Sequence, residues 1–310
     1  MGTSPFALPS LERLHQGNFH LEGVITRPDS YAGRGKKLII SPVKEKALQY
    51  GLNLYQPQGP EQLLEVLRTL NFQVLINVAY GLFLPGTILQ LPPLGCVNLH
   101  PSLLPAYRGA APIQRALLAG EETTGVTVMY MSPRLDAGDI ILQEKVDIGP
   151  EENYGSLHDR LAKTGGALLE KALTLIAGGR APRRPQDEER TTYAPPLSRE
   201  DEIISWPDPA RKIFNQIRAL DPAPGAYTIY RGKRLKIWKA AAGEVQSLNL
   251  KENQGPITPG TILSVNDDTF QVATGQGALT VLELQLAGKK RMPVSEFLRG
   301  NKLKAGEGFG

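Results

Sequence analysis

Hydrophobic positions follow helical and strand periods in turn along the first 180 residues. Apolar residues at every third or fourth position predict helices, and short apolar runs closed by turn residues predict strands. Helices are expected over residues 8–16, 41–51, 61–70, 111–120 and 154–179. Strands are expected over residues 21–29, 72–81, 95–100, 124–131 and 139–148. Strands that alternate with helices predict an α/β fold with a parallel sheet covered on both faces.

The hydrophobic period stops near residue 180 and resumes near residue 206. The stretch 181–205 is rich in proline and charge, which predicts a linker. After it, a helix is expected over 208–220, and short β-like runs follow at 226–232, 233–240, 260–266, 269–274 and 278–287. Several short strands at close spacing predict a small barrel of the oligonucleotide-binding (OB) type. The chain is therefore divided into domains at 1–180 and 206–310, joined by the linker 181–205.

The beginning of the chain departs from the α/β pattern. MGTSPFALPSL starts with a glycine turn and a helix, and no strand lies ahead of them. In doubly wound folds the first strand leads into such a turn and lies in the middle of the sheet. The first strand of the sheet is therefore expected to be missing.

Composition narrows the class of protein. The chain is 41% hydrophobic and 21% charged, and no apolar run reaches the roughly 18 residues of a membrane span. No signal or transit segment is recognised at the N-terminus. One cysteine cannot form an internal disulfide, which favours a reducing, cytoplasmic location. Cys96 lies between apolar residues, so we expect it to be buried and unreactive.

The net charge of +4 is unevenly distributed. From Trp206 onwards there are 15 Lys and Arg against 9 Asp and Glu, whereas the preceding part has 20 against 22. A neutral half joined to a basic half suggests that the basic half binds a polyanion. A solvated, lysine-rich surface explains the same numbers, and charge alone does not separate the two.

Asn98 and His100 are the first candidates for chemistry. They lie two positions apart at the end of the predicted strand 95–100, so their side chains point to the same face. Ligands of α/β sheets bind outside the carboxyl ends of strands. An amide can donate to an oxyanion, and an imidazole can donate or move a proton. Pro101 and Pro105 stiffen the exit of the strand. A structural histidine is the alternative interpretation.

A carboxylate in the loop between the strands 124–131 and 139–148 is the next candidate. Asp136 and Asp139 both lie there, and their chemistry alone does not choose between them. A carboxylate next to an imidazole favours its charged form. An Asn, a His and an Asp without a Ser or Cys nucleophile indicate direct acyl transfer rather than a covalent enzyme intermediate.

Two other patterns in the chain bear on ligand binding. The loop 27–44 is rich in Gly and Lys but lacks the spacing of a P-loop. It is suited to closing over an anionic substrate, although an exposed basic turn has the same composition. His15, His20 and His158 have no metal-ligand spacing among themselves or with Cys96, so no metal site is expected.

Several motifs occur together in a recognisable order: NVAYGLFLP, GCVNLHPSLLPAYRGAAPIQ, LDAGD, AGRGKK with SPVK, TTYAPPLS, and PGAYT with RGKRLKIWKA. Together they resemble the methionyl-tRNA formyltransferase family from Gly2 nearly to the C-terminus. The resemblance implies a Rossmann-like formyltransferase domain and a C-terminal OB-like barrel that helps hold tRNA. It also implies transfer of a formyl group from 10-formyltetrahydrofolate to the amino group of methionyl initiator tRNA, by a monomer without a metal.

The resemblance also assigns residues. The catalytic Asn, His and Asp of the family fall on Asn98, His100 and Asp136, which selects between the two aspartates. The folate-binding residues implied are Tyr80, Gly81, Leu82, Pro85, Ser102, Leu103, Leu104, Pro105 and Asp139. The tRNA-binding residues implied are Arg34, as the principal arginine of the basic loop, with Lys36, Lys37, Lys233, Arg234, Lys236, Lys289, Lys290 and Arg291.

Three rival functions and one departure from the family stay open. The rivals are a formyltransferase for an amino-sugar nucleotide, a formylfolate hydrolase, and a catalytically weak RNA-binding homologue. The departure is at Gly2-Thr3, which in the family follows a short strand, and at Ser4-Pro5, which replaces a Pro-acidic pair. A start codon assigned inside the gene would explain it. A chain that truly lacked the strand is expected to be destabilised or weakly active.

Overall fold

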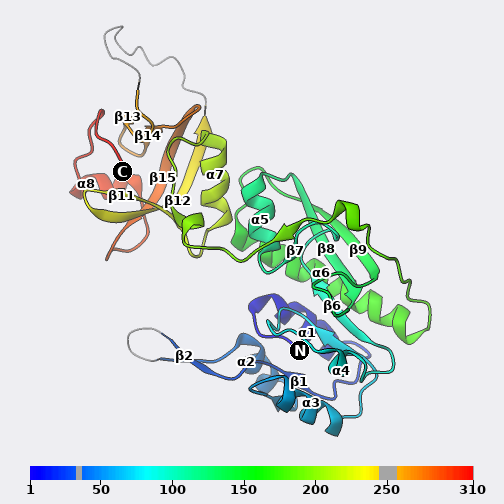
Figure 1. Ribbon diagram of the computed structural model, residues 1–310. Coiled ribbons are helices and arrows are strands. Elements are labelled where there is room, and N and C mark those ends of the chain that lie inside the picture. The colour runs from blue at the N-terminus through cyan, green and yellow to red at the C-terminus, as the bar shows by residue number, and fades with distance from the viewer. Residues whose placement is uncertain (33–36, 244–256, 310) are drawn as a thin grey trace. The chain divides into compact units, whose positions relative to one another are not determined.

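The computed structural model describes residues 1–32, 37–243 and 257–309, and divides the chain into two compact units (Figure 1). The first unit comprises residues 1–112, 123–148 and 158–195. The second comprises residues 113–122, 149–157 and 196–310. The chain therefore enters the second unit twice before it stays there. The predicted domain ranges, drawn as contiguous stretches, stay a prediction.

The first unit is built from strands and helices in alternation. Its helical elements are η1 (Pro5–Ala7), α1 (Leu8–Gln16), α2 (Pro42–Gln49), α3 (Pro60–Thr69), α4 (Gly86–Leu89), α6 (Tyr154–Ala177) and η2 (Glu188–Arg190). Its strands are β1 (Val24–Ile25), β2 (Ser30–Ala32), β3 (Lys37–Ile39), β4 (Leu54–Tyr55), β5 (Leu75–Asn77), β6 (Cys96–His100), β7 (Arg108–Gly109), β8 (Thr123–Tyr130), β9 (Ile140–Asp147) and β10 (Tyr193–Ala194). This arrangement confirms the predicted α/β class.

The main sheet of this unit is mixed. β5 pairs with β6 in parallel, and β1 pairs with β4 in parallel, as the alternation predicted. β8 is antiparallel to both β6 and β9, so the parallel pairing that the alternation predicted does not extend to this half of the sheet. The loop 131–139 between β8 and β9 explains part of the difference, because a parallel crossover needs about a dozen residues or more.

The first three residues partly occupy the place of the expected first strand. No strand is assigned ahead of η1 in the described residues, yet Gly2 forms a parallel bridge to Val78. The Gly2 amide donates to the Ile25 carbonyl at 3.0 Å, and the Val78 amide donates to the Met1 carbonyl at 2.9 Å. The segment thus joins β1 to the edge of β5. The sheet contains at this point a short stretch of extended chain rather than a gap.

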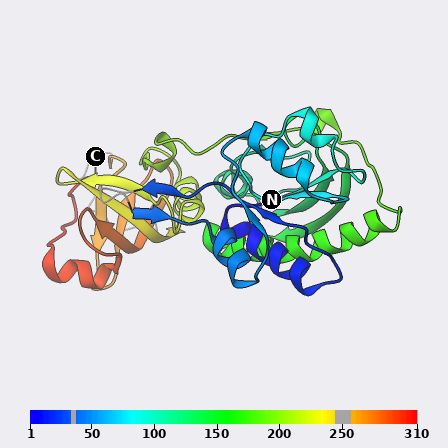
Figure 2. The ribbon, with the colours of Figure 1, turned by 90° about the horizontal axis from the view of Figure 1, so that it is seen from below.

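β6 is covered differently on its two faces. On one face, α6 runs along the sheet (Figure 2), and a Cβ at its Gly165 would lie 2.7 Å from the Leu99 side chain. On the other face, Cys96 joins an apolar cluster with Ile25, Leu63, Leu67, Leu75, Tyr80, Leu84 and Ile88. Burial raises the pKa of the Cys96 thiol to about 12, which agrees with the predicted buried, unreactive thiol. Asn98 and His100 share this second face and follow Cys96 towards the carboxyl end.

The second unit is an antiparallel sheet with packed helices. Its helical elements are α5 (Pro112–Ala119), η3 (Glu200–Glu202), α7 (Ala210–Ala219) and α8 (Val294–Gly300). Its strands are β11 (Ala226–Tyr230), β12 (Lys233–Gly243), β13 (Ile262–Val265), β14 (Phe270–Ala273), β15 (Ala278–Leu286) and β16 (Met292–Pro293). They pair in the order β11-β12-β15-β14-β13, with β16 beside β15. Among these strands no pairing closes the path, so the described part is an open relative of the predicted barrel.

Candidate active site

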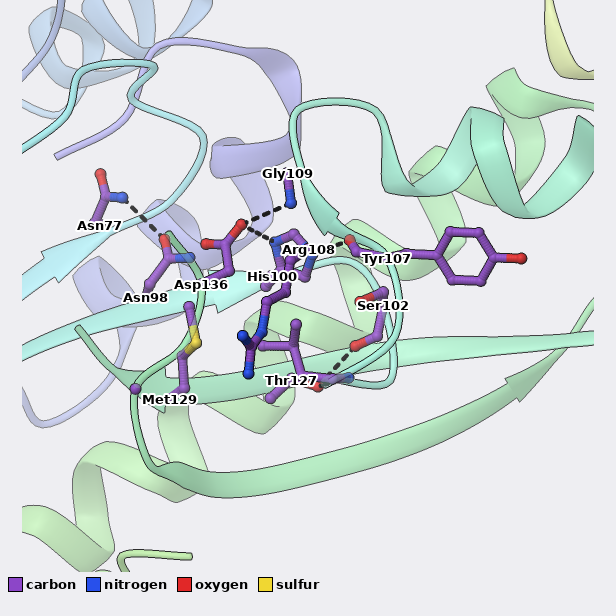
Figure 3. A network of polar contacts seen from close by, with 12 residues as sticks. Asn77, Asn98, His100, Ser102, Tyr107, Arg108, Gly109, Thr127, Met129 and Asp136 are labelled. Atoms are coloured by element: carbon purple, nitrogen blue, oxygen red, sulfur yellow. Dashed lines mark hydrogen bonds and ion pairs between the residues drawn. The ribbon is translucent and has the colours of Figure 1, made fainter. Parts of the chain in front are cut away.

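The strand β6 carries the two polar side chains that the sequence singled out. Asn98 is 7% exposed and His100 is 4% exposed, and both lie at the carboxyl end of the strand. Across the sheet, Asn98 is opposite Asn77 on β5 and Met129 on β8, and His100 is opposite Thr127. The site is therefore built inside the sheet, where the backbone ladder fixes the position of each Cβ (Figure 3).

Both nitrogens of His100 have defined surroundings. Nε2 lies 2.9 Å from the carbonyl oxygen of Tyr107. Because a carbonyl can only accept, Nε2 must carry the hydrogen of this bond. Nδ1 faces Oδ2 of Asp136 at 3.6 Å. Nδ1 is therefore the nitrogen that can gain or lose a proton without breaking the bond to Tyr107.

The structure distinguishes the two aspartates that the residues alone left open. Asp136 is largely buried, and its Oδ2 accepts a hydrogen bond from the Gly109 amide at 2.9 Å and faces His100. Asp139 is 37% exposed and lies 3.9 Å from the guanidinium of Arg183. Its backbone carbonyl accepts from the Tyr130 amide and closes the base of the loop 131–139. The geometry brings Asp136, and not Asp139, to the imidazole.

The amide of Asn98 is oriented by a neighbour that the sequence did not single out. Nδ2 of Asn77 donates to Oδ1 of Asn98 at 2.9 Å, from the adjacent strand (Figure 3). With its oxygen occupied in this way, Asn98 has its Nδ2 group available to a ligand. An amide whose nitrogen faces a ligand donates to an oxygen atom, which suits an oxyanion. Asn77 lies inside the predicted strand 72–81, and its polar side chain in a mostly apolar run was the only signal available in the sequence.

Gly109 connects the loop after β6 to Asp136. Its φ is +124°, and a Cβ there would lie 2.7 Å from the Ala194 carbonyl. We expect Gly109→Ala to move the amide of residue 109 away from Asp136. The rate of the reaction at this site, measured in a single turnover, should then fall about 100-fold, because misplacing a catalytic group by about 1 Å has an effect of this size. Gly59→Ala is the matched control, because a Cβ at Gly59 meets no atom within 4 Å. A Gly109→Ala enzyme with the parent rate would contradict this assignment.

The predicted folate residues lie in two segments. In the first, Tyr80 is 1% exposed in the apolar cluster, and its carbonyl accepts a hydrogen bond from the Thr3 hydroxyl at 3.1 Å, so Tyr80 is part of the core beneath this loop. Gly81 has a φ of +79°, Leu82 is half-buried, and Pro85 directly precedes α4. The neighbouring Phe83 is 63% exposed, and so it is the larger apolar surface that this loop offers.

The second segment, residues 102–105, is held by internal hydrogen bonds. The Ser102 hydroxyl donates to the Ala106 carbonyl at 2.6 Å, and the Thr127 hydroxyl donates to the Ser102 carbonyl at 2.7 Å. Leu104 is buried against Met129 and Ile140. Leu103 and Pro105 are half-buried. The segment forms a fixed wall next to His100, and Leu135, which is 56% exposed, precedes Asp136 in the opposite loop.

Of the predicted tRNA residues in the basic loop, Arg34 and Lys36 lie outside the described residues. Lys37 is the first residue of β3, whose backbone pairs with β2. At the base of this hairpin, Nζ of Lys44 donates to Asp29 at 2.6 Å and to Gln56 at 2.9 Å. These bonds fix the base of the β2–β3 hairpin within the first unit.

The predicted tRNA residues of the second unit differ in their partners. Arg234 lies 4.2 Å above the ring of Tyr227, and Lys236 lies 5.3 Å from the ring of Trp238. Arg291 is held by Asp221 at 2.6 Å and by Glu283 at 2.7 Å. Lys290 pairs with Glu296, and Lys233 and Lys289 are exposed. The two carboxylates give Arg291 a structural role, and Lys236 is half-buried and also donates to the Pro224 carbonyl. The exposed cations of this set are Lys233, Arg234, Lys289 and Lys290.

The remaining histidines have local partners. His15 stacks on Tyr50 with ring centroids 4.1 Å apart, His20 pairs with Glu22, and His158 pairs with Asp159. Within the described ranges, no group of three or more His, Cys, Asp or Glu side chains could hold a metal ion. The helices described there are also too short or too polar to cross a lipid bilayer.

Comparisons with known proteins cover almost the whole chain. Residues 1–173 match the family model described as formyl transferase, and residues 196–302 match the formyl transferase C-terminal domain. The chain is 47% identical over 312 residues to the methionyl-tRNA formyltransferase of Syntrophus aciditrophicus, covering 100% of this chain and 97% of that protein. It is 50% identical to the methionyl-tRNA formyltransferase of Moorella thermoacetica, covering 100% and 98%.

Solved structures show the same fold at lower identity. The sugar 3N-formyl transferase WlaRD, determined with dTDP and 5-N-formyl-THF, superposes with a TM-score of 0.65 at 19% identity, covering 93% of this chain and 97% of that chain. An N-formyltransferase from Helicobacter canadensis, in complex with folinic acid and dTDP-3-aminofucose, gives 0.66 at 17% identity, covering 94% and 97%. HypX from Aquifex aeolicus with tetrahydrofolic acid gives 0.60 at 19% identity, covering 84% and 47%.

Proposed function

The chain belongs to the methionyl-tRNA formyltransferase family, and on this basis we propose that Asn98, His100 and Asp136 carry out its reaction. The enzyme transfers a formyl group to the amino group of methionyl-tRNA. We take 10-formyltetrahydrofolate as the donor and the initiator methionyl-tRNA as the acceptor. Action as a monomer in the cytoplasm stays a prediction.

The reaction forms one carbon–nitrogen bond and breaks another. The neutral amine of the methionyl group attacks the formyl carbon, and the formyl oxygen gains negative charge in the tetrahedral intermediate. The bond from this carbon to N10 of the folate then breaks. The attacking nitrogen loses a proton and N10 gains one, so no proton is consumed overall. The site must therefore stabilise an oxyanion and move a proton.

Each of the three side chains suits one of these tasks. Asn98 has its oxygen occupied by Asn77, so its NH2 group can donate to the oxyanion. His100 has Nε2 occupied by Tyr107, so Nδ1 is the nitrogen that serves the substrate. Asp136 faces Nδ1 and stabilises its protonated form, from which a proton can pass to the leaving nitrogen. The observation that carries the proposal is this convergence at the carboxyl end of β6.

The donor and the acceptor require different kinds of binding surface around Asn98, His100 and Asp136. Folate has a flat aromatic ring system, and the exposed Phe83 and Leu135 supply apolar contacts in the loops that bear Tyr80 and Asp136. tRNA is a polyanion, and the exposed cations of β12 supply charge on the second unit. Arg234 over the ring of Tyr227 combines a cation with an aromatic group, as single-stranded nucleic acid sites do.

The function is tested by offering rival acceptors to one enzyme preparation. With 10-formyltetrahydrofolate, we expect rapid formylation of methionyl initiator tRNA, and no more than background with an elongator methionyl-tRNA or an amino-sugar nucleotide. A reaction without acceptor measures hydrolysis of the donor. We also expect the KM for tRNA to rise steeply between 50 and 200 mM salt, about 10-fold or more, because ions compete for the phosphates. Faster use of the sugar nucleotide or of water would overturn the proposal.

A further inference from the structure

Gln186 holds the loop that carries Asp136, although it lies in the segment predicted to be a linker. Its Nε2 donates to the carbonyl of Asp136 at 2.8 Å and to the carbonyl of Gly138 at 2.8 Å. Both hydrogens of the amide are therefore used on backbone oxygens on either side of Ala137. The approach of this segment is fixed just before Gln186, where Arg184 and Ile140 exchange backbone hydrogen bonds at 2.8 and 3.1 Å.

The orientation of the Gln186 amide is fixed by a buried arginine. Arg108 is 2% exposed, and its Nε and Nη2 donate to Oε1 of Gln186 at 3.0 and 2.8 Å. The same guanidinium donates to Glu188 at 3.2 and 3.1 Å, which lowers the pKa of that carboxyl. A rotated amide would place its NH2 group against the guanidinium and its oxygen against two carbonyls. Only the observed orientation satisfies every group.

Asp136 needs such support, because its backbone is in the left-handed region with a φ of +48°. A non-glycine residue there costs free energy and persists only where the surrounding structure holds it. The base of the loop is closed by the bond from Tyr130 to Asp139, several residues away from the carboxylate. The two bonds from Gln186 are made at Asp136 itself and at Gly138, where the strain is located.

Arg108 also lies between the two residues that contact the catalytic groups directly. The carbonyl of Tyr107 accepts from His100, and the amide of Gly109 donates to Asp136. The backbone on either side of Arg108 thus contacts His100 and Asp136, while its side chain reaches the same aspartate through Gln186. The two routes form a closed set of hydrogen bonds around the imidazole–carboxylate pair.

We propose that Gln186, oriented by Arg108, is a positioning residue that sets the distance of the Asp136 carboxylate from Nδ1 of His100. The proposal rests on the role of Asp136 in the proposed function. Gln186 acts through the backbone of Asp136, so its loss affects the rate of the chemical step more than substrate binding.

Gln186→Glu is the sharpest variant, because it is nearly isosteric and keeps an oxygen on Arg108. It removes both donors and places a carboxylate oxygen against the carbonyls of Asp136 and Gly138. With methionyl initiator tRNA and 10-formyltetrahydrofolate, we expect kcat to fall about 10- to 100-fold, as for a catalytic group displaced by up to about 1 Å. The KM values for both substrates should stay within about 3-fold of the parent values, because Gln186 makes no contact that binds the substrate and the transition state equally. Glu189→Gln, the reverse change at an exposed neighbour, should leave kcat at the parent value.

A double-mutant cycle separates positioning from general damage. Asp136→Asn alone should lower kcat strongly, and adding Gln186→Glu to it should then lower kcat by less than about 3-fold, because the two residues act as one unit. Gln186→Met replaces Gln186→Glu if the latter fails to fold, as judged by circular dichroism. If the kcat losses of the two single variants multiply in the double variant, or if KM rises without a fall in kcat, the proposed role of Gln186 is wrong. The role of Asp136 is not affected by that outcome. Parent activity in Asp136→Asn would overturn the role of Asp136, and the inference with it.

Discussion

We expect His100→Ala to lower the single-turnover rate of formyl transfer about 1,000-fold, which is within the range that a positioned acid or base contributes. The variant removes the imidazole that faces Asp136, which is the group proposed to receive the proton of the attacking amine. It also removes the hydrogen bond to the Tyr107 carbonyl. The measurement is a rapid-quench experiment with enzyme in excess over methionyl-tRNA at saturating donor, so that product release does not enter the rate.

The control for this experiment is His20→Ala. His20 has an 87% exposed side chain that pairs only with Glu22 on the surface, and the variant should keep the parent rate. The binding of tetrahydrofolate, measured by calorimetry, shows whether the His100→Ala protein still forms its donor site. A folded His100→Ala enzyme that loses less than 10-fold in rate would exclude His100 from proton transfer.

Asn98→Ala has the second largest expected effect, a fall in kcat of about 100- to 1,000-fold, as for the loss of one oxyanion donor in other enzymes. The oxygen of the substrate gains charge only as the bond to the amine forms, so the lost contact is one made mainly in the transition state. The KM for 10-formyltetrahydrofolate should therefore change little. Steady-state kinetics with each substrate varied in turn measures both constants.

Asn18→Ala is the matched control, because Asn18 is exposed at the end of α1. The two variants also differ in their expected effect on thermal stability. Asn98→Ala deprives the Asn77 amide of its acceptor, so a modest loss of thermal stability accompanies the loss of rate. An Asn98→Ala enzyme whose KM rises while kcat is unchanged would assign Asn98 to substrate binding instead of oxyanion stabilisation.

The placement of Asn98 and His100 side by side could be predicted because both residues belong to one strand. The alternation of side chains along residues 96–100 is a local property, and it places Asn98 and His100 on one face whatever the rest of the fold does. The choice of Asp136 over Asp139 was not local. It depends on how the loop 131–139 closes between β8 and β9, and from the residues themselves both carboxylates were equally suitable.

The residues that support the site could not be predicted, because their partners are distant along the chain. Asn77 meets Asn98 only through the parallel register of β5 and β6. Arg108 follows a proline-rich turn, and arginine is a residue type usually found on the surface. Arg108 is nevertheless buried, and it contacts Gln186 and Glu188. The stretch around Gln186 has no apolar period, which is the usual mark of a linker. This stretch is held by backbone pairing with β9 and β7, and backbone pairing requires no pattern of hydrophobic residues.

The architecture shows the same division between local and distant information. Helices with a clear amphipathic period, such as α3 and α7, lie within two residues of the predicted ranges. The hairpin of β2 and β3 and the helix α8 were missed, because each is short and its apolar residues make no clear period. The antiparallel direction of β8 was not predicted, because a hydrophobic pattern indicates that a strand exists but not the direction in which it runs.

The second unit includes residues 113–122 and 149–157, and this limits how the protein can be dissected. Asn153 donates to the carboxylate of Asp221 at 2.7 Å, and Arg218 donates to the carbonyls of Gly149 and Glu152. A fragment cut at the proline-rich stretch would keep Asp221 and Arg218 and lose these three partners. Residues 113–122, which include most of α5, and residues 149–157, which include the first turn of α6, would stay in the other fragment. Neither piece would then be a faithful substitute for its half of the enzyme, so reconstitution from separately expressed halves must begin from different cutting points.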